Sequence, residues 1–348
     1  MPGRVGSAYT CEMTRAFTLT VAITLATSCP GAAQTYSIVD LGTLGGSSSS
    51  AYGINSLGEI VGVAASTSDM HAFFYSGGKM TDLGTLGGEY SQGQSINASG
   101  SVTGYSTLAD GTYRAFLYSN SHMTDLGTLG SSYSVAYAIN DAGQVVGSST
   151  TSTGLSHAFL YSGGEMIDLG TLGVNQPGWT TTAYGVNASG EVVGYSYVNS
   201  GNFRGFLYAN GSMHALGTLG GSWSQAFAIN NSGQITGQAY LPKNVEAHAF
   251  LYSGGKMTDL GALYQYSSGL AINNSGVIVG TANVNDGTVN LVYHAVIYAN
   301  GKPHDLNTLI PSHSGWVLSS ANSVNDTGQI VGYGTIKGAQ HAFLLTPQ

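Results

Sequence analysis

Charge is scarce in this sequence. Only 7% of the 348 residues are Asp, Glu, Lys or Arg, and 17 acidic residues outnumber 9 basic ones. Proteins that bind nucleic acid need a basic surplus to neutralise phosphates, and a net charge of −8 is the opposite. We therefore expect no nucleic acid among the partners.

Cysteine is almost absent. Its two copies, Cys11 and Cys29, both lie in the first 33 residues, so the rest of the chain can form no disulfide. Arg15 precedes an uncharged run over 16–26, and small residues follow at 31–33. This pattern predicts a secretory signal peptide, 1–33, cleaved near Ala33.

Three further features concern this leader. Met13 is an alternative start that gives a more conventional short n-region. Lipidation of Cys29 is disfavoured, because Ala26 stands where a lipoprotein signal usually has a larger aliphatic residue. The run over 16–26 is too short and too rich in Thr to span a membrane. We expect a secreted or periplasmic protein that is not membrane-spanning.

A repeated motif, in contrast, fills the rest of the chain. D-L-G-T-L or a near copy recurs at intervals of 42 to 47 residues. The seven copies begin at Asp40, Asp82, Asp125, Asp168, Ala215, Asp259 and Asp305. A period of this length indicates stacked or radially arranged units.

Each repeat contains four short segments in fixed order. They are a run ending in Asn, then G-x-V-V-G, H-A-F-L-Y and x-M-x-D-L-G, and all are rich in β-branched or aromatic residues. We predict four strands and name them a, b, c and d. Asn-x-x-Gly separates a from b, and Gly-Gly or Asn-Gly separates c from d, so both pairs are predicted hairpins.

The ends of the repeat predict how the units are arranged. The segments are apolar on both faces, which requires sheets on either side of each unit, as in propeller blades. The repeat opens with a lone d segment, 36–41, and closes with a lone c segment, 341–345. We predict an all-β, seven-bladed propeller over 34–348, closed by these two segments and monomeric. The alternative, a β-helix with two coils per period, gives no reason for complementary ends.

With H-A-F-L-Y, D-L-G-T-L-G-G, A-I-N and G-x-V-V-G in order, the chain resembles the bacterial extracellular HAF-repeat family over about 36–345. The resemblance implies export and a propeller, but no settled activity and no catalytic residues. Four residues depart from the motifs, namely Arg114, Arg204, Ala215 and Val296.

The recurrent histidines are His71, His157, His248, His294 and His341. A ring of imidazoles could suggest a metal site, but no metal-ligand spacing such as H-x-H or C-x-x-C accompanies them. In five repeats the His or Arg instead precedes a D-L-G Asp by 11 residues, as in His157 and Asp168, whereas Arg204 precedes Ala215. We predict a polar pair within these five c–d hairpins, no metal and no cofactor.

The connections from b to c and from d to a vary most in length, and both emerge on one face of a propeller. We call this the loop face. The d–a connections carry an aromatic residue at a matching position in six of the seven repeats. The exception is the first repeat, which has Ser48 at this position. These candidate ligand-binding residues are Tyr90, Tyr133, Trp179, Trp223, Tyr266 and Trp316, and Tyr105, Tyr195 and Tyr333 would add to the same face. They suit stacking on sugar rings, or alternatively wedge between neighbouring blades.

Catalysis has weaker candidates. Acidic residues and one His outside the repeat pattern lie in the same connections and could perform acid–base chemistry, or could simply be solvated charges. They are Asp69, Asp110, Glu246, Asp286 and His313. We expect a binding module for extracellular glycans or surface polymers. The alternatives are a hydrolase or lyase acting on a polysaccharide and a purely structural surface protein.

Overall fold

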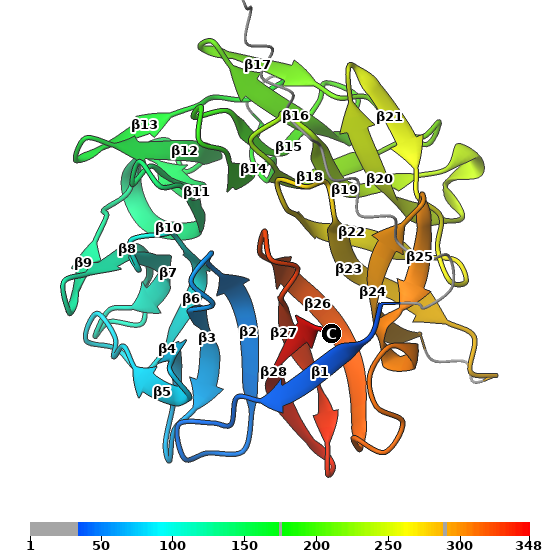
Figure 1. Cartoon of the computed structure of the whole chain (residues 1–348). Coiled ribbons are helices and arrows are strands. Elements are labelled where there is room, and N and C mark those ends of the chain that lie inside the picture. The colour runs from blue at the N-terminus through cyan, green and yellow to red at the C-terminus, as the bar shows by residue number, and fades with distance from the viewer. Residues whose placement is uncertain (1–33, 174–175, 288–290) are drawn as a thin grey trace, which may run out of the picture. The chain divides into compact units, whose positions relative to one another are not determined.

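A computed structural model describes residues 34–173, 176–287 and 291–348. The predicted signal peptide lies outside these residues. Gln34–Gln348 form one compact unit, in which seven four-stranded antiparallel sheets surround a central axis (Figure 1). The predicted seven-bladed propeller is therefore confirmed. No helix within the described part of the chain is long and apolar enough to cross a membrane.

The blades follow one another in sequence, and each of the first six runs from its inner strand a to its outer strand d. Blade 1 contains β2 (Ser49–Ile54), β3 (Ile60–Ala65), β4 (Met70–Ser76) and β5 (Lys79–Asp82). Blade 2 contains β6 (Ser91–Ile96), β7 (Val102–Thr107), β8 (Tyr113–Ser119) and β9 (His122–Asp125). Blade 3 contains β10 (Gly130–Ile139), β11 (Val145–Thr151), β12 (Ser156–Ser162) and β13 (Glu165–Asp168). Blade 4 contains β14 (Thr181–Val186), β15 (Val192–Tyr197), β16 (Phe203–Ala209) and β17 (Ser212–Ala215).

The remaining blades complete the circle. Blade 5 contains β18 (Ser224–Ile229), β19 (Ile235–Tyr240), β20 (Ala247–Ser253) and β21 (Lys256–Asp259), with the 3-10 turn η1 (Pro242–Asn244) before β20. Blade 6 contains β22 (Ser267–Ile272), β23 (Ile278–Val284), β24 (Val292–Ala299) and β25 (Lys302–Asp305). After η2 (Leu306–Thr308), blade 7 contains β26 (Trp316–Val324), β27 (Ile330–Ile336) and β28 (Ala339–Pro347).

The ring closes as the ends of the repeat predict. The first strand, β1 (Tyr36–Asp40), pairs antiparallel with β28 and becomes the outer strand of blade 7 (Figure 1). The register joins Tyr36 to Pro347 at one end and Asp40 to Phe343 at the other. Since β1 covers the otherwise unpaired edge of β28, blade 7 has the same four strands as its neighbours.

The core lies between the blades and is built from one repeated contact. Six of the seven c strands place a fully buried Phe there, as Phe159 does in blade 3, and Val296 takes this place in blade 6. The second Gly of each G-x-V-x-G motif allows close packing beside it. A Cβ on Gly147 would lie 1.9 Å from the Val135 carbonyl and 2.8 Å from the Phe159 ring. Only glycine fits at this position.

Every a strand contains a β-bulge three residues before its Asn. In blade 1 the register shifts between Ala51 and Gly53, so Tyr52 has no partner on β3, and the other six blades repeat this irregularity. Bulges redirect side chains. The seven bulged residues all line the centre of the propeller, and they are Tyr52, Gln94, Tyr137, Tyr184, Phe227, Leu270 and Asn322.

The Asn at the end of each a strand connects its blade to the next. In blade 1 the Asn55 side-chain oxygen accepts hydrogen bonds from the Leu57 and Glu59 backbone N–H groups, which holds the turn. Its Nδ2 donates to the Asn97 carbonyl oxygen of blade 2 at 3.1 Å. The same bond recurs at 2.9–3.3 Å around the whole ring and ends with Asn325 donating to Asn55. We call these residues the Asn ring.

Candidate functional site

The centre of the propeller holds two cavities, one behind the other. The larger, about 420 Å³, is lined by the bulged residues and the two residues that follow each of them. The smaller, about 280 Å³, is lined by the Asn ring. The residue immediately before each Asn lines both cavities. These seven residues form an aliphatic ring between the cavities: Ile54, Ile96, Ile139, Val186, Ile229, Ile272 and Val324. Since strand a runs from the loop face to the Asn ring, the larger cavity lies toward the loop face.

The larger cavity is not sevenfold symmetric. Its bulged residues are aromatic in blades 1, 3, 4 and 5 and are Gln94, Leu270 and Asn322 in the other three. The rings of Tyr137 and Tyr184 lie 4.8 Å apart, and those of Tyr184 and Phe227 lie 5.5 Å apart. This side of the cavity is therefore a continuous aromatic wall. Because the residue type at the bulged position differs from blade to blade, the wall is not required by the repeated architecture and is a candidate for function.

Next to this wall, blades 2 and 3 form a cavity of about 220 Å³ that we call the Tyr pocket. Five tyrosines and one valine line it, namely Tyr90, Tyr105, Tyr113, Tyr133, Tyr137 and Val135. Tyr137 also lines the larger central cavity, so the two are adjacent. Tyr113 and Tyr133 are the most accessible rings, with 37% and 38% of their surface exposed.

A second group of rings, which we call the Trp band, covers the loop face of blades 4 and 5. Trp179 stacks on Tyr197 with centroids 5.5 Å apart and planes 21° apart. Phe203 lies 5.7 Å from Tyr197 and 5.1 Å from Trp223, which in turn lies 4.3 Å from Tyr240. All five rings are partly exposed. Because each ring is supported by another, the band is a preformed surface.

The structure corrects the alignment of two tryptophans. In blades 2, 3, 5 and 6 the aromatic residue of the d–a connection lies seven residues before the Asn, but in blade 4 this place belongs to Thr180. The Thr180 carbonyl accepts a hydrogen bond from Tyr197 N–H, as the Tyr90 carbonyl does from Thr107 in blade 2. Trp179 is therefore one residue out of register.

Trp316 is also out of register, and in blade 7 this turns the indole away from the loop face and into the core. An additional irregularity in β26, between Leu318 and Ser320, places Val317 at the exposed position and Trp316 on the opposite side of the strand. Side chains alternate between faces along a strand, so a shift of one residue reverses the direction. Trp316 is 9% exposed and packs in the core, 6.1 Å from Phe343, whereas Val317 is 50% exposed. We therefore exclude Trp316 from the candidate surface.

The sixth candidate, Tyr266, lies on the loop face of blade 6 away from both aromatic groups. Its hydroxyl donates to the Val245 carbonyl oxygen at 3.0 Å, which ties the d–a connection to the preceding b–c connection. Tyr105 and Tyr195 join the Tyr pocket and the wall of the central cavity, respectively. The sequence missed the bulged aromatics, although counting three residues back from each Asn would have found them.

The five acid–base candidates lie on connections of five different blades. Asp69, Asp110, Glu246 and Asp286 follow the b strands of blades 1, 2, 5 and 6, and His313 precedes β26 of blade 7. Hydrogen bonds from the Thr112 hydroxyl and backbone N–H to Asp110 lower the pKa of that carboxyl. A carboxyl held in this way is a poor general acid. Among the described residues, no group of three or more His, Cys, Asp or Glu could hold a metal.

The repeated His and Asp residues form pairs within the blades, as predicted. The Nδ1 atoms of His71, His157, His248, His294 and His341 lie 2.7–2.9 Å from the carboxylates of Asp82, Asp168, Asp259, Asp305 and Asp40. Arg114 replaces His in blade 2, and its Nε lies 3.6 Å from Asp125. The pair in blade 7 joins His341 to Asp40 of β1, so it also fastens the closure.

Among the described residues, Arg204 of blade 4 has no acidic partner, because Ala215 replaces the Asp. Its guanidinium donates instead to the carbonyl oxygens of Phe203 and Ser222. The Arg114 guanidinium makes the corresponding bond to Ser132. Both cations are thus used to hold the backbone of the next blade's d–a connection.

No family model matches the chain, and no curated protein matches it. Solved structures that are similar include TolB from Acinetobacter baumannii, with 12% identity, a TM-score of 0.46 and coverage of 83% of this chain and 63% of that one. A gluconolactonase from Xanthomonas campestris has 8% identity, a TM-score of 0.41 and 89% coverage of both chains. The six-bladed fucose-binding lectin of Aleuria aurantia has 11% identity, a TM-score of 0.40 and coverage of 90% and 94%. These likenesses do not bear on what this chain binds.

Proposed function

We propose that the protein is an exported binding module for extracellular glycans or surface polymers, and that the Trp band is its principal contact surface. The observation that carries this proposal is the Trp band itself, in which partly exposed rings support one another on two neighbouring blades. Flat, fixed aromatic faces stack well on the apolar faces of sugar rings. Such a surface also loses little conformational entropy on binding.

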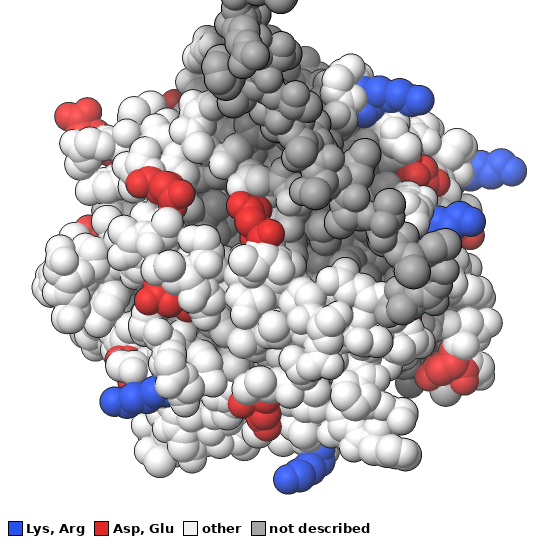
Figure 2. All heavy atoms as spheres, in the orientation of Figure 1, with Lys and Arg blue, Asp and Glu red and all other residues white. Residues whose placement is uncertain are grey.

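The asymmetry of the aromatic rings supports a binding role over a structural one. A residue that only wedges blades apart is needed equally in all seven. Of the ring contacts among the described residues, all but the core pair Trp316–Phe343 fall within blades 2 to 5. Only 7% of the residues are charged, and Figure 2 shows acidic and basic side chains scattered over the visible described surface. Such a surface suits an uncharged polymer.

The ordered motifs lead us to propose membership in the HAF-repeat family, and the leader leads us to propose export. Neither depends on the identity of the ligand. The enzymatic alternative requires acid–base groups that converge from different blades, because the acid–base candidates are distributed one to a blade. An enzyme that cleaves glycosides needs two carboxyl groups held about 5–10 Å apart.

A glycan array on the purified protein tests the proposal, with product detection for every glycan that binds. We expect saturable binding without turnover, and loss of most of the signal in Trp223→Ala. Tyr264→Ala is the control, because Tyr264 is an aromatic residue that is 48% exposed but lies outside the Trp band and the Tyr pocket. Equal binding by Trp223→Ala and the wild type would contradict the proposal, and a cleaved product would establish the enzymatic alternative.

A further inference from the structure

The Tyr pocket differs chemically from the Trp band. Two of its hydroxyls, those of Tyr90 and Tyr105, donate to the same side-chain oxygen of Gln92, the second at 3.1 Å. These hydroxyls are therefore engaged within the protein. Apart from tyrosine hydroxyls, the described residues that line the pocket offer a sugar no polar side chain, because the sixth lining residue is Val135.

The rings are arranged around a common space. The centroids of Tyr105 and Tyr113 lie 5.7 Å apart with their planes at 62°, and those of Tyr113 and Tyr133 lie 6.3 Å apart at 65°. Tyr90 lies 6.0 Å from Tyr105 and 6.1 Å from Tyr113. A group bound in this space would contact several of the rings at once. The volume of about 220 Å³ is below the roughly 300–1,000 Å³ typical of sites for larger ligands, so the pocket suits a small head group.

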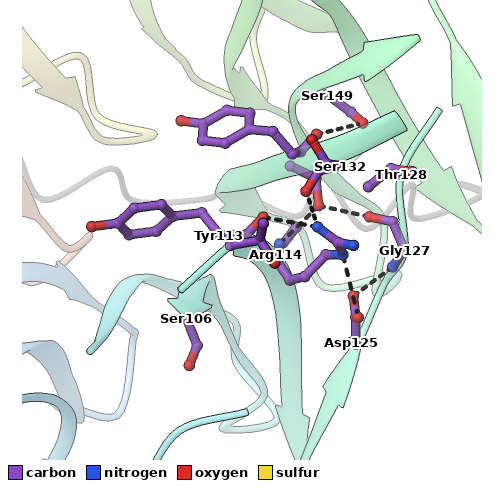
Figure 3. Close-up of polar contacts among 12 residues, drawn as sticks. Ser106, Tyr113, Arg114, Asp125, Gly127, Thr128, Ser132 and Ser149 are labelled. Atoms are coloured by element: carbon purple, nitrogen blue, oxygen red, sulfur yellow. Dashed lines mark hydrogen bonds and ion pairs between the residues drawn. The ribbon is translucent and has the colours of Figure 1, made fainter. Parts of the chain in front are cut away.

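The electrostatics favour a cation. No basic side chain in the described part of the chain lines the pocket. Figure 3 shows the Tyr113 ring and the Arg114 guanidinium projecting to different sides, with Arg114 directed at Asp125 and Ser132. Burial raises the pKa of Tyr90, Tyr105 and Tyr133, so these rings stay neutral at physiological pH. The negative end of each ring quadrupole lies on its face, where it attracts a positive charge.

We propose that the Tyr pocket binds a quaternary ammonium group. A methylated ammonium has no N–H to satisfy, and a pocket of ring faces offers what it needs: apolar contact for the methyl groups and cation–π attraction for the charge. A primary ammonium would lose hydrogen bonds to water, and tyrosine hydroxyls are the only side-chain acceptors among the described residues that line the pocket. The proposal is independent of glycan binding by the Trp band, since the two sites share no ring.

Isothermal titration with tetramethylammonium chloride and choline chloride at constant ionic strength tests the proposal. The neutral isostere of choline, 3,3-dimethylbutan-1-ol, separates cation–π attraction from apolar contact. We expect saturable 1:1 binding of both cations and about 5- to 30-fold weaker binding of the neutral alcohol. Equal affinity for choline and the alcohol, or no saturable binding of either cation, would overturn the proposal.

Two substitutions at Tyr113 locate the site. Tyr113→Phe keeps the ring face and should retain affinity within about threefold, whereas Tyr113→Leu should weaken tetramethylammonium binding about tenfold. Tyr264→Ala should bind as the wild type does, and unchanged thermal unfolding shows that each variant is folded. Unaltered affinity in folded Tyr113→Leu would place the cation elsewhere. Cosedimentation with phosphatidylcholine vesicles then distinguishes a lipid head group from a free ligand.

Discussion

At the scale of the single residue, the Asp of the D-L-G motif contacts both a side chain of strand c and a backbone N–H group of the d–a connection. In blade 6, Asp305 accepts a hydrogen bond from the His294 ring at 2.7 Å and others from Asn307. In the five other motifs that keep the Asp, its carboxylate accepts a hydrogen bond from the backbone N–H of the Gly two residues later. The carboxylate therefore fixes both strand c and the start of the d–a connection, which accounts for its repetition without a catalytic role.

The His294–Asp305 pair predicts how stability changes with pH. The hydrogen bond to Asp305 raises the pKa of His294 against the opposing effect of burial. Burial raises the pKa of Asp305, but hydrogen bonds from His294 and Asn307 outweigh it and lower that pKa overall. The raised His pKa contributes stability that is complete below about pH 6.5 and is lost as pH rises through the folded value. The lowered Asp pKa contributes stability that is complete above about pH 4 and is lost as pH falls through the folded value.

We therefore expect His294→Ala to lower the free energy of unfolding most between about pH 4 and 6.5, and less at pH 9. Urea unfolding of the wild type and of His294→Ala at pH values from about 4 to 9 measures the difference in unfolding free energy. His122→Ala is the control, because His122 is exposed and not among the His–Asp pairs. A destabilisation that did not vary with pH would show that His294 acts by packing alone.

Strand a is the element that joins architecture to function. Its terminal Asn holds the turn and the next blade, while the bulge three residues earlier aims a variable side chain at the central cavity. The bulge does not depend on the side chain, because Tyr, Gln, Phe, Leu and Asn all occupy it. The fixed part of the strand thus supports a position that is free to vary.

Asn140→Asp tests the Asn ring with little change in shape. The side-chain oxygen that accepts from Ala142 and Gln144 is kept, but the Nδ2 that donates to Asn187 and Gln144 is lost. A buried carboxylate facing a carbonyl oxygen should cost about 1–3 kcal/mol of unfolding free energy or more, measured by urea denaturation. The control Asn120→Asp changes an exposed turn and should cost less than about 0.5 kcal/mol. Similar losses in both variants would exclude a special role for the ring.

Sequence patterns predicted the strands well and their irregularities poorly. The hairpins were evident because Asn-x-x-Gly and Gly-Gly have few conformations open to them. Trp179 and Trp316 were misaligned because connection length varies in blades 4 and 7, and an irregularity such as that at Leu318 has no sequence signature. A one-residue slip decides whether an indole faces solvent or core.

The closed ring is a property of the whole molecule. Sheet pairing between β1 and β28, the His341–Asp40 pair and the bond from Asn325 to Asn55 join the two ends of the chain at the outer edge and near the axis. The sequence predicted the pairing of the two end segments because they complement each other, but it did not predict the His341–Asp40 pair. It did not predict the Asn ring, since the blades that each Asn joins are known only once the circle is formed.

Deletion of 36–40 should open the ring. It removes the outer strand of blade 7 and leaves the edge of β28 unpaired, and exposed edges promote association. We expect a lower unfolding temperature and concentration-dependent oligomers in light scattering. Addition of a synthetic peptide covering 35–41 should reverse both effects, whereas a scrambled peptide should not. A deletion variant that stays monomeric and equally stable would show that β1 is dispensable.

The central claim of this account is that the residues of the repeated motifs maintain the fold, while the aromatic residues confined to some blades bind the ligand. One comparison tests it directly: Asp168→Ala and Trp223→Ala, each measured by urea unfolding and on the same glycan array. We predict that Asp168→Ala loses about 1–3 kcal/mol of stability and keeps glycan binding, because it leaves His157 without its carboxylate. Trp223→Ala should lose binding with a smaller change in stability. Loss of binding in folded Asp168→Ala, with binding retained in Trp223→Ala, would contradict the account.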